Sequence, residues 1–232
     1  MKLVLFDVDG TLVDAAGAGR WAIDRAFEKV FGIGPIDSRR SSVRFNGRTD
    51  PSIISEIAEK NRIEPGDLAA RRGEIEATYL ALLEERLSPS PNPARALPGV
   101  PDLLAELRRR RVPFGLLTGN LRRGAELKLR AVDLDGFFDD GAFGSDGADR
   151  SVLARIARER FEARAGRPID PSDVSVVGDA PEDVRAGRAN GYRCLAVRTG
   201  WCEPGELEAL RPDLLLADLT ATEEVVNWFL AG

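Results

Sequence analysis

Histidine is absent from the 232 residues of this chain, and its absence excludes several kinds of chemistry. A Ser-His-Asp triad, a Cys-His pair, a His-ligated zinc site and an imidazole proton shuttle all need the missing side chain. Proton transfer must therefore fall to Asp, Glu, Lys, Tyr, Cys or water. A bound metal would sit among oxygen ligands, which favours Mg²⁺, Ca²⁺ or Mn²⁺ over zinc.

Cysteines and long apolar runs are also scarce. Cys194 and Cys202 are too few for a disulfide framework, so we expect reduced thiols in a cytoplasmic protein. No run approaches the ~18 apolar residues of a membrane span, and the opening MKLVLF meets Asp7 too soon for a signal peptide. The net charge of −5 disfavours nucleic acid and anionic membranes as partners.

Short apolar segments alternate with helical patterns over most of the chain. This alternation predicts an α/β fold with a doubly wound parallel sheet, in which ligands bind at the carboxyl ends of the strands. The expected strands are residues 2–6, 112–117, a weak segment at Phe143, 174–177, 194–197 and 214–216. The expected helices between them are residues 101–110, 122–132, 151–165 and 182–189.

One stretch breaks the alternation. Residues 15–87 show only helical periodicity, and the proline-rich residues 88–93 that follow cannot continue a helix. We therefore predict an inserted, all-helical cap domain over residues 15–90, with a core made of residues 1–14 and 91–232. Gly17 and Gly19 stand near the entry to the cap, where a hinge could lie.

The strongest chemical signal follows the first strand. Asp7 and Asp9 point to the same face because successive strand residues alternate, and two carboxylates this close repel unless a cation or a shared proton intervenes. An ionised Asp7 could attack phosphorus as a nucleophile. Gly10 permits a sharp turn, and Thr11 offers a hydroxyl and a backbone N–H to an oxyanion.

An acidic turn could instead bind calcium. An EF-hand loop that began at Asp7 would need Asp or Asn where Thr11 stands and Glu where Ala18 stands. Both positions fail, which leaves a solvated turn as the alternative to a catalytic site.

Polar residues also follow two later strands. Asp179 ends the strand at 174–177, where it could meet a cation at Asp7, and Asp183 opens the next helix on the same loop. Residues 118–120 read Thr-Gly-Asn before a helix, an arrangement that can bind an anion with backbone N–H groups. We interpret Glu182 as an ordinary helix N-terminal residue, favoured there by the helix dipole.

The basic partner of a phosphate is left open between Arg150 and Lys128. Arg150 begins a helix after the third core segment, whereas Lys128 has the position of a solvated helix residue. In the cap, Arg44 and Arg48 could bind a second anionic group of a substrate. The alternative is an exposed loop in which Asp50 caps the following helix.

These pieces, in this order, resemble the haloacid dehalogenase-like hydrolase superfamily, and its phosphoglycolate phosphatase-like members in particular. DVDGT at 7–11, LLTGN at 116–120 and VVGDAPEDV at 176–184 are similar to three of its motifs, and the helical insertion resembles its cap. Many relatives carry Lys-Pro in the remaining motif, where this chain has Asp149-Arg150.

The resemblance implies roles for these residues. Asp7 would be the nucleophile that forms an aspartyl-phosphate, and Asp9 would protonate the leaving alcohol and then activate water. Mg²⁺ would be held by Asp7, the backbone carbonyl of Asp9, Asp179 and Asp183. The phosphoryl oxygens would be held by Thr118, Gly119, Asn120 and Arg150, beside the turn at Gly10 and Thr11.

Asp9 also decides between activities within the superfamily, because true dehalogenases lack this second Asp and use no metal. We therefore expect a Mg²⁺-dependent phosphatase that acts on a small phosphorylated metabolite. A sugar phosphomutase is the nearest alternative, and a phospho-Asp signalling module, which would hold its phosphoryl group for a long time, is a more distant one. A monomer and a weak dimer both remain open.

Overall fold

The computed structural model describes residues 1–88 and 94–231. Its main sheet has six strands, all paired in parallel, and confirms the predicted doubly wound α/β fold. The strand order is β5 (Gly141–Ala142), β4 (Phe114–Leu117), β1 (Leu3–Phe6), β6 (Val174–Gly178), β7 (Arg193–Val197) and β8 (Leu214–Leu216). The chain order reverses at β1, so the crevice of this sheet lies beside β1.

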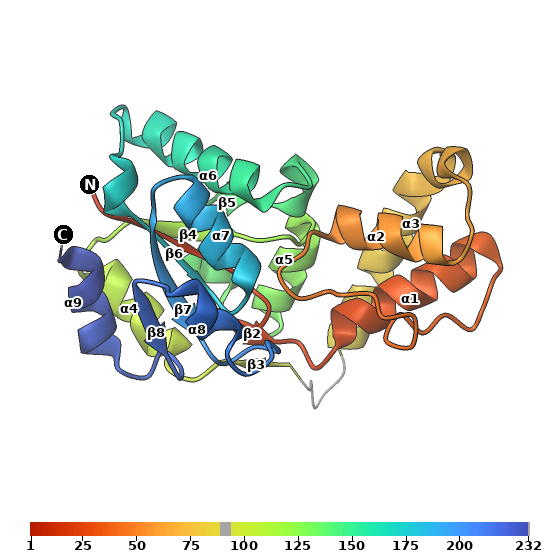
Figure 1. The fold of residues 1–232 in the computed structure, drawn as a ribbon, viewed down its shortest axis with the longest axis horizontal. Helices are drawn as coiled ribbons and strands as arrows, with labels where there is room; N and C mark the ends of the chain where they lie inside the picture. The colour runs from red at the N-terminus through yellow and green to blue at the C-terminus, as the bar shows by residue number, and fades with distance from the viewer. Residues whose placement is uncertain (89–93, 232) are drawn as a thin grey trace.

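Strand β1 is buried on both faces, as its unbroken apolar sequence predicts. Leu3 and Leu5 belong to one apolar cluster, with α6 and α7, while Val4 and Phe6 belong to another, with α4 and α9. Helices thus cover both faces of the sheet (Figure 1). They are α4 (Val100–Arg109), α5 (Arg122–Arg130), α6 (Arg150–Ala165), α7 (Pro181–Ala189), α8 (Glu206–Leu210) and α9 (Thr222–Leu230).

Three further helices form a lobe at one side of the sheet (Figure 1). They are α1 (Ala18–Phe31), α2 (Asp50–Lys60) and α3 (Pro65–Leu87). Helices α1 and α3 pack against each other, and the buried side chains of these two helices include Ile23, Phe27, Ile75 and Tyr79. The predicted linker at 88–93 lies outside the described residues, apart from Ser88.

The structure also contains elements that the sequence patterns did not predict. A small antiparallel ribbon joins β2 (Val13–Asp14) to β3 (Arg95–Ala96), at the two points where the chain passes to and from the helical lobe. Phe143 lies just beyond β5, not within a strand. Short 3₁₀ turns occur at Asp135–Phe137, Gly144–Asp146 and Pro171–Asp173. None of the helices in the described part is long and apolar enough to cross a membrane.

Candidate active site

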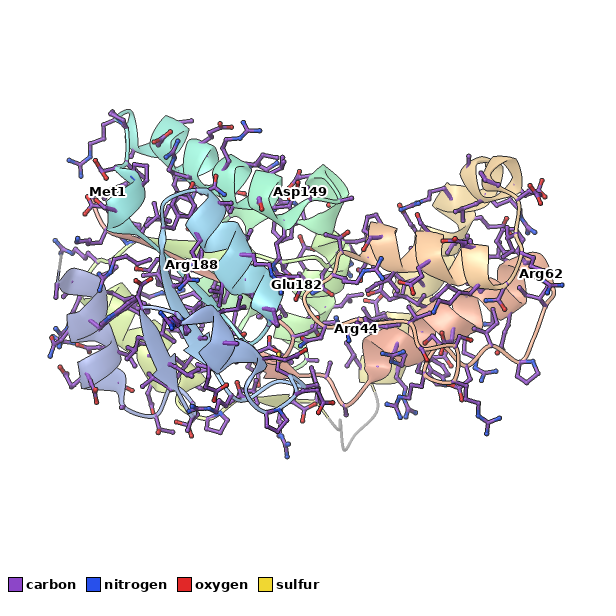
Figure 2. The ribbon with its side chains drawn as sticks, in the orientation of Figure 1. Met1, Arg44, Arg62, Asp149, Glu182 and Arg188 are labelled. Carbon is purple, nitrogen blue, oxygen red and sulfur yellow. The ribbon has the colours of Figure 1, made fainter. Side chains whose placement is uncertain are left out.

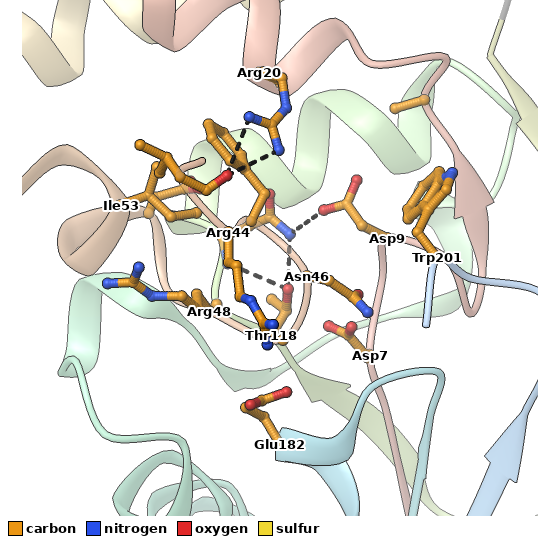
Figure 3. A pocket seen from close by; sticks show the side chains of 18 of the residues that line it. Asp7, Asp9, Arg20, Arg44, Asn46, Arg48, Ile53, Thr118, Glu182 and Trp201 are labelled. Atoms are coloured by element: carbon orange, nitrogen blue, oxygen red, sulfur yellow. Dashed lines mark hydrogen bonds between the residues drawn. The ribbon is translucent and has the colours of Figure 1, made fainter. Parts of the chain in front are cut away.

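The central strands place three polar residues at one edge of the sheet. Asp7 follows β1, Thr118 follows β4 and Asp179 follows β6, and parallel strands bring their carboxyl ends together. The backbone N–H of Asp7 donates to the carbonyl of Val177 at 2.9 Å, which extends the β1–β6 pairing to the site. A cavity of about 710 Å³ separates this edge from the helical lobe, with Asp7 and Asp9 in its wall (Figure 3).

Asp7, in the wall of the cavity, lies close to two further buried carboxylates. One oxygen each of Asp7, Asp179 and Asp183 lies within 4.8 Å of the others. Burial and the charge of Asp7 raise the pKa of Asp179 well above its ordinary value, and the Oδ2 atom of Asp179 has no hydrogen-bond partner. An unpartnered buried carboxylate oxygen among like charges fits a hard divalent cation such as Mg²⁺, which takes oxygen ligands.

Arg150 is the cation that the structure places beside these carboxylates. Its guanidinium nitrogen Nη2 lies 2.7 Å from Oδ1 of Asp7 and 2.6 Å from Oδ1 of Asp183. The same nitrogen donates to the carbonyl of Leu117 at 3.2 Å, and the side chain is buried. Arg150 therefore sits next to Asp7, the residue predicted to be the nucleophile, at the start of α6.

Lys128 contacts the other carboxylate of the predicted pair. Its ammonium group lies 2.6 Å from Oδ2 of Asp9 and 2.5 Å from Oδ1 of Asn120. Only 4% of Lys128 is exposed, so the expectation that it is a solvated helix residue is wrong. The physical reason is that Asp9 and Asn120 supply the polar partners that a buried ammonium group requires.

The turn after β1 is packed against Asp179. Gly10 has a φ of +80°, and a Cβ atom there would lie 2.6 Å from Oδ2 of Asp179, so the turn requires glycine. The Thr11 hydroxyl, which we expected to face an oxyanion, instead donates to Oδ1 of Asp179 at 3.3 Å. This turn therefore fixes the position of Asp179.

The Thr-Gly-Asn turn after β4 contacts both lobes. The Thr118 hydroxyl oxygen accepts hydrogen bonds from the backbone N–H and the side-chain amide of Asn120, at 3.2 and 2.7 Å. The carbonyl of Gly119 accepts from the backbone N–H of Asp50 at 2.7 Å. A Cβ atom at Gly119 would lie 2.1 Å from the carbonyl oxygen of Arg48, so the close approach of the helical lobe explains this glycine.

Asp50 does not cap α2 as the exposed-loop alternative expected. Thr49 is the N-cap, and its hydroxyl accepts from the backbone N–H of Ser52 at 3.3 Å. Oδ2 of Asp50 instead accepts from the backbone N–H of Leu121 at 2.9 Å and from the hydroxyl of Tyr79 at 3.2 Å. Burial raises the pKa of Asp50 to about 6. The hydrogen bond between Leu121 and Asp50 therefore connects the start of α2 to the start of α5.

The two predicted specificity arginines differ in their surroundings. Arg44 is exposed and lines the cavity across from Glu182 of α7 (Figures 2 and 3). Arg48 also borders the cavity, but its guanidinium pairs with Glu56 and donates to the carbonyl of Ser52 at 3.2 Å. Arg44 is therefore the freer of the two to meet a ligand.

Comparisons with known proteins agree with this geometry. The family model of haloacid dehalogenase-like hydrolases matches residues 1–191. The chain belongs to this family. It is 30% identical over 218 residues to a phosphoglycolate phosphatase of Synechococcus elongatus, with 93% of this chain and 92% of the relative covered.

Two further matches cover nearly the whole chain. A validoxylamine A 7'-phosphate phosphatase of Streptomyces hygroscopicus subsp. limoneus is 30% identical over 227 residues, with 94% of each chain covered. A crystal structure of a hydrolase from Pseudomonas syringae has a TM-score of 0.74 at 21% identity and covers 98% of this chain and 99% of that one. That likeness shows a shared fold.

Sequence reasoning missed two polar contacts of this hydrolase. Lys128 follows Ala125 by about one helical turn and the N-cap residue Leu121 by about two, a spacing that places all three on one buried side of α5. That spacing was the available signal. Asn46 donates from the helical lobe to the Cys202 sulfur at 3.2 Å, and no sequence pattern links these two residues.

Proposed function

We propose that this hydrolase is a Mg²⁺-dependent phosphatase that cleaves a small phosphomonoester through an aspartyl-phosphate on Asp7. One observation carries the proposal: the two carboxylates that follow β1 have separate surroundings. Asp7 lies against Arg150 and two further buried carboxylates, whereas Asp9 lies against Lys128 and Asn120 at the cavity wall. Two carboxylates with different environments can take different roles in one reaction.

The first step transfers the phosphoryl group to the enzyme. A carboxylate oxygen of Asp7 attacks phosphorus, and the bond from phosphorus to the ester oxygen breaks. Asp9 gives its proton to that departing oxygen, so the products are an alcohol, the aspartyl-phosphate and an ionised Asp9. Arg150 and the turn at 118–120 stabilise the charge on the phosphoryl oxygens.

The second step regenerates the enzyme. The ionised Asp9 takes a proton from water as the water oxygen attacks phosphorus, and the bond to Asp7 breaks. Inorganic phosphate leaves, Asp7 is again a carboxylate and Asp9 is again protonated. This step separates a phosphatase from a signalling module, because a long-lived aspartyl-phosphate lacks such a base.

Mg²⁺ fits the buried acidic cluster. Asp7, Asp179 and Asp183 would hold the ion together with the backbone carbonyl of Asp9, as the unpartnered oxygen of Asp179 supports. When bound, Mg²⁺ supplies positive charge that reduces the repulsion between Asp7 and the phosphate of the substrate.

The helical lobe would act as the cap, formed by residues 15–90 over a core of residues 1–14 and 91–232. Its loop before α2 supplies Arg44 to the cavity, where the guanidinium can bind a second anionic group or a hydroxyl of the substrate. Two relatives are named for phosphoglycolate and for validoxylamine A 7'-phosphate, which are small phosphomonoesters of different size. Phosphoglycolate-like acids and sugar phosphates are therefore the substrates to test.

A phosphate-ester panel tests this function directly. The purified protein is incubated with each ester with and without Mg²⁺, and both inorganic phosphate and isomerised sugar phosphate are measured. We expect phosphate release that depends on Mg²⁺, and its loss by at least about a thousandfold in Asp7→Asn, which lacks the nucleophile. Isomerised product would indicate a mutase, and undiminished activity of Asp7→Asn would exclude the mechanism.

A further inference from the structure

Asp9 is held through only one of its two carboxylate oxygens. Lys128 donates to Oδ2 of Asp9 at 2.6 Å, and the side-chain amide of Asn120 donates to the same atom at 2.8 Å. Lys128 also donates to Oδ1 of Asn120 at 2.5 Å, so the three side chains form a closed set of hydrogen bonds. Within the described residues, Oδ1 of Asp9 has no hydrogen-bond partner.

The free oxygen belongs to a side chain that still reaches the cavity. The side chain of Asp9 is 34% exposed and borders the cavity, while that of Lys128 is 5% exposed. We propose that Lys128 is a positioning residue that holds Asp9 so that Oδ1 carries the proton given to the leaving group. This inference rests on the proposed phosphatase function and assigns a role that Arg150 cannot fill, because Arg150 contacts Asp7 and Asp183.

The residues around Lys128 offer polar partners and space for its ammonium group. Its neighbours come from four elements: Asp9 after β1, Asn120 after β4, Asp50 of α2 through its charge, and Gly19 of α1. A Cβ atom at Gly19 would lie 3.3 Å from the ammonium nitrogen, so glycine leaves room for it. A buried ion pair is weak evidence of stabilisation, since desolvation offsets most of the attraction.

The positioning role has a chemical reason. The terminal torsion of an aspartate has broad, roughly two-fold minima, so an unheld carboxylate can turn either oxygen toward the substrate. A proton donor that is misplaced by about 1 Å can cost about a hundredfold in rate. Two donors on Oδ2 reserve Oδ1 for the proton, which then passes to the departing ester oxygen.

This role predicts a particular dependence on the leaving group. A p-nitrophenolate departs readily without a proton, whereas a benzyl alkoxide is strongly basic and needs the proton as the bond breaks. Loss of Lys128 should therefore harm the cleavage of benzyl phosphate far more than that of p-nitrophenyl phosphate. A purely structural role would harm both equally, and a substrate-binding role would raise KM while leaving kcat unchanged.

The experiment measures kcat and KM with Mg²⁺ for p-nitrophenyl, phenyl and benzyl phosphate in the wild type, Lys128→Met and Lys128→Arg. The matched control is Lys29→Met, which removes an exposed lysine of α1. For Lys128→Met we expect kcat/KM to fall about a hundredfold on benzyl phosphate and less than about threefold on p-nitrophenyl phosphate. Lys128→Arg keeps a donor and should reduce the gap between the two esters.

The ratio kcat/KM reports the reaction only up to departure of the leaving group, so slow hydrolysis of the aspartyl-phosphate does not disturb the comparison. If Lys128→Met does not fold, Lys128→Gln replaces it, because it removes the charge but keeps a polar group beside Asp9 and Asn120. Equal losses on all three esters, or no loss, would overturn the role of Lys128 alone. A wild type inactive on every ester would overturn the phosphatase function beneath it.

Discussion

Replacing Asp50 by Asn should make the free energy of unfolding depend less on pH. Asp50 is a buried carboxylate that joins the helical lobe to the core through the backbone N–H of Leu121, and burial raises its pKa from 3.8 to about 6. The folded protein therefore binds this proton more tightly than the unfolded chain does. The stability contributed by the proton is complete below pH 3.8 and is lost as the pH rises through 6.

The size of the effect follows from the shift. A difference of about 2.2 pKa units, at about 1.36 kcal/mol for each unit, corresponds to about 3 kcal/mol. Asn keeps an oxygen that can accept from Leu121 and Tyr79 but does not ionise. From pH 4 to pH 7, the free energy of unfolding should therefore fall by about 2.4 kcal/mol more in the wild type than in Asp50→Asn, because part of the contribution is already lost at pH 4.

The assay is urea unfolding at several pH values between 4 and 8, followed by far-ultraviolet circular dichroism. The remaining carboxylates are common to both proteins, so the difference between the two curves isolates Asp50. Asp102→Asn, at an exposed position of α4, is the control and should follow the wild type. Parallel curves for the wild type and Asp50→Asn, or a difference of the opposite sign, would refute the reasoning.

Two further substitutions probe the glycine turn and the acidic cluster. In Gly119→Ala the new methyl group would lie 2.1 Å from the carbonyl oxygen of Arg48, so we expect a loss of about 1–3 kcal/mol in urea unfolding and a lower kcat/KM. Mg²⁺ should raise the Tm of the wild type by relieving repulsion among Asp7, Asp179 and Asp183. Asp183→Asn should reduce that Mg²⁺-dependent increase, and an equal increase in both proteins would contradict the proposed site.

The fold was largely predictable because burial imposes a simple pattern. A strand such as Leu3–Phe6, covered on both faces, must be apolar throughout, and helices between such strands require a parallel sheet. The ribbon of β2 and β3 was not predictable, since two residues in each strand leave no periodicity to detect. Its pairing joins Val13 to Ala96, positions that stand on either side of the helical lobe in the sequence.

The candidate site was predictable where its residues follow a strand. Asp7, Thr118 and Asp179 meet because the topology sets three strand ends side by side. The contacts of Asp50 with the core were missed because Thr49 and Asp50 are both good N-cap residues, so local preference cannot separate them. The choice is made by a donor in the core, the backbone N–H of Leu121, 71 residues away in the sequence.

The sequence could not decide whether Arg150 or Lys128 is the basic residue of the site. The choice assumed a single cation, whereas the structure places both residues there: Arg150 contacts Asp7, and Lys128 contacts Asp9. A planar guanidinium can contact two carboxylates at once, while a compact ammonium can bind one carboxylate and one amide. In the mechanism we propose for this chain without histidine, the nucleophile and the proton donor are both aspartates, and their separate cations make the two carboxylates chemically different.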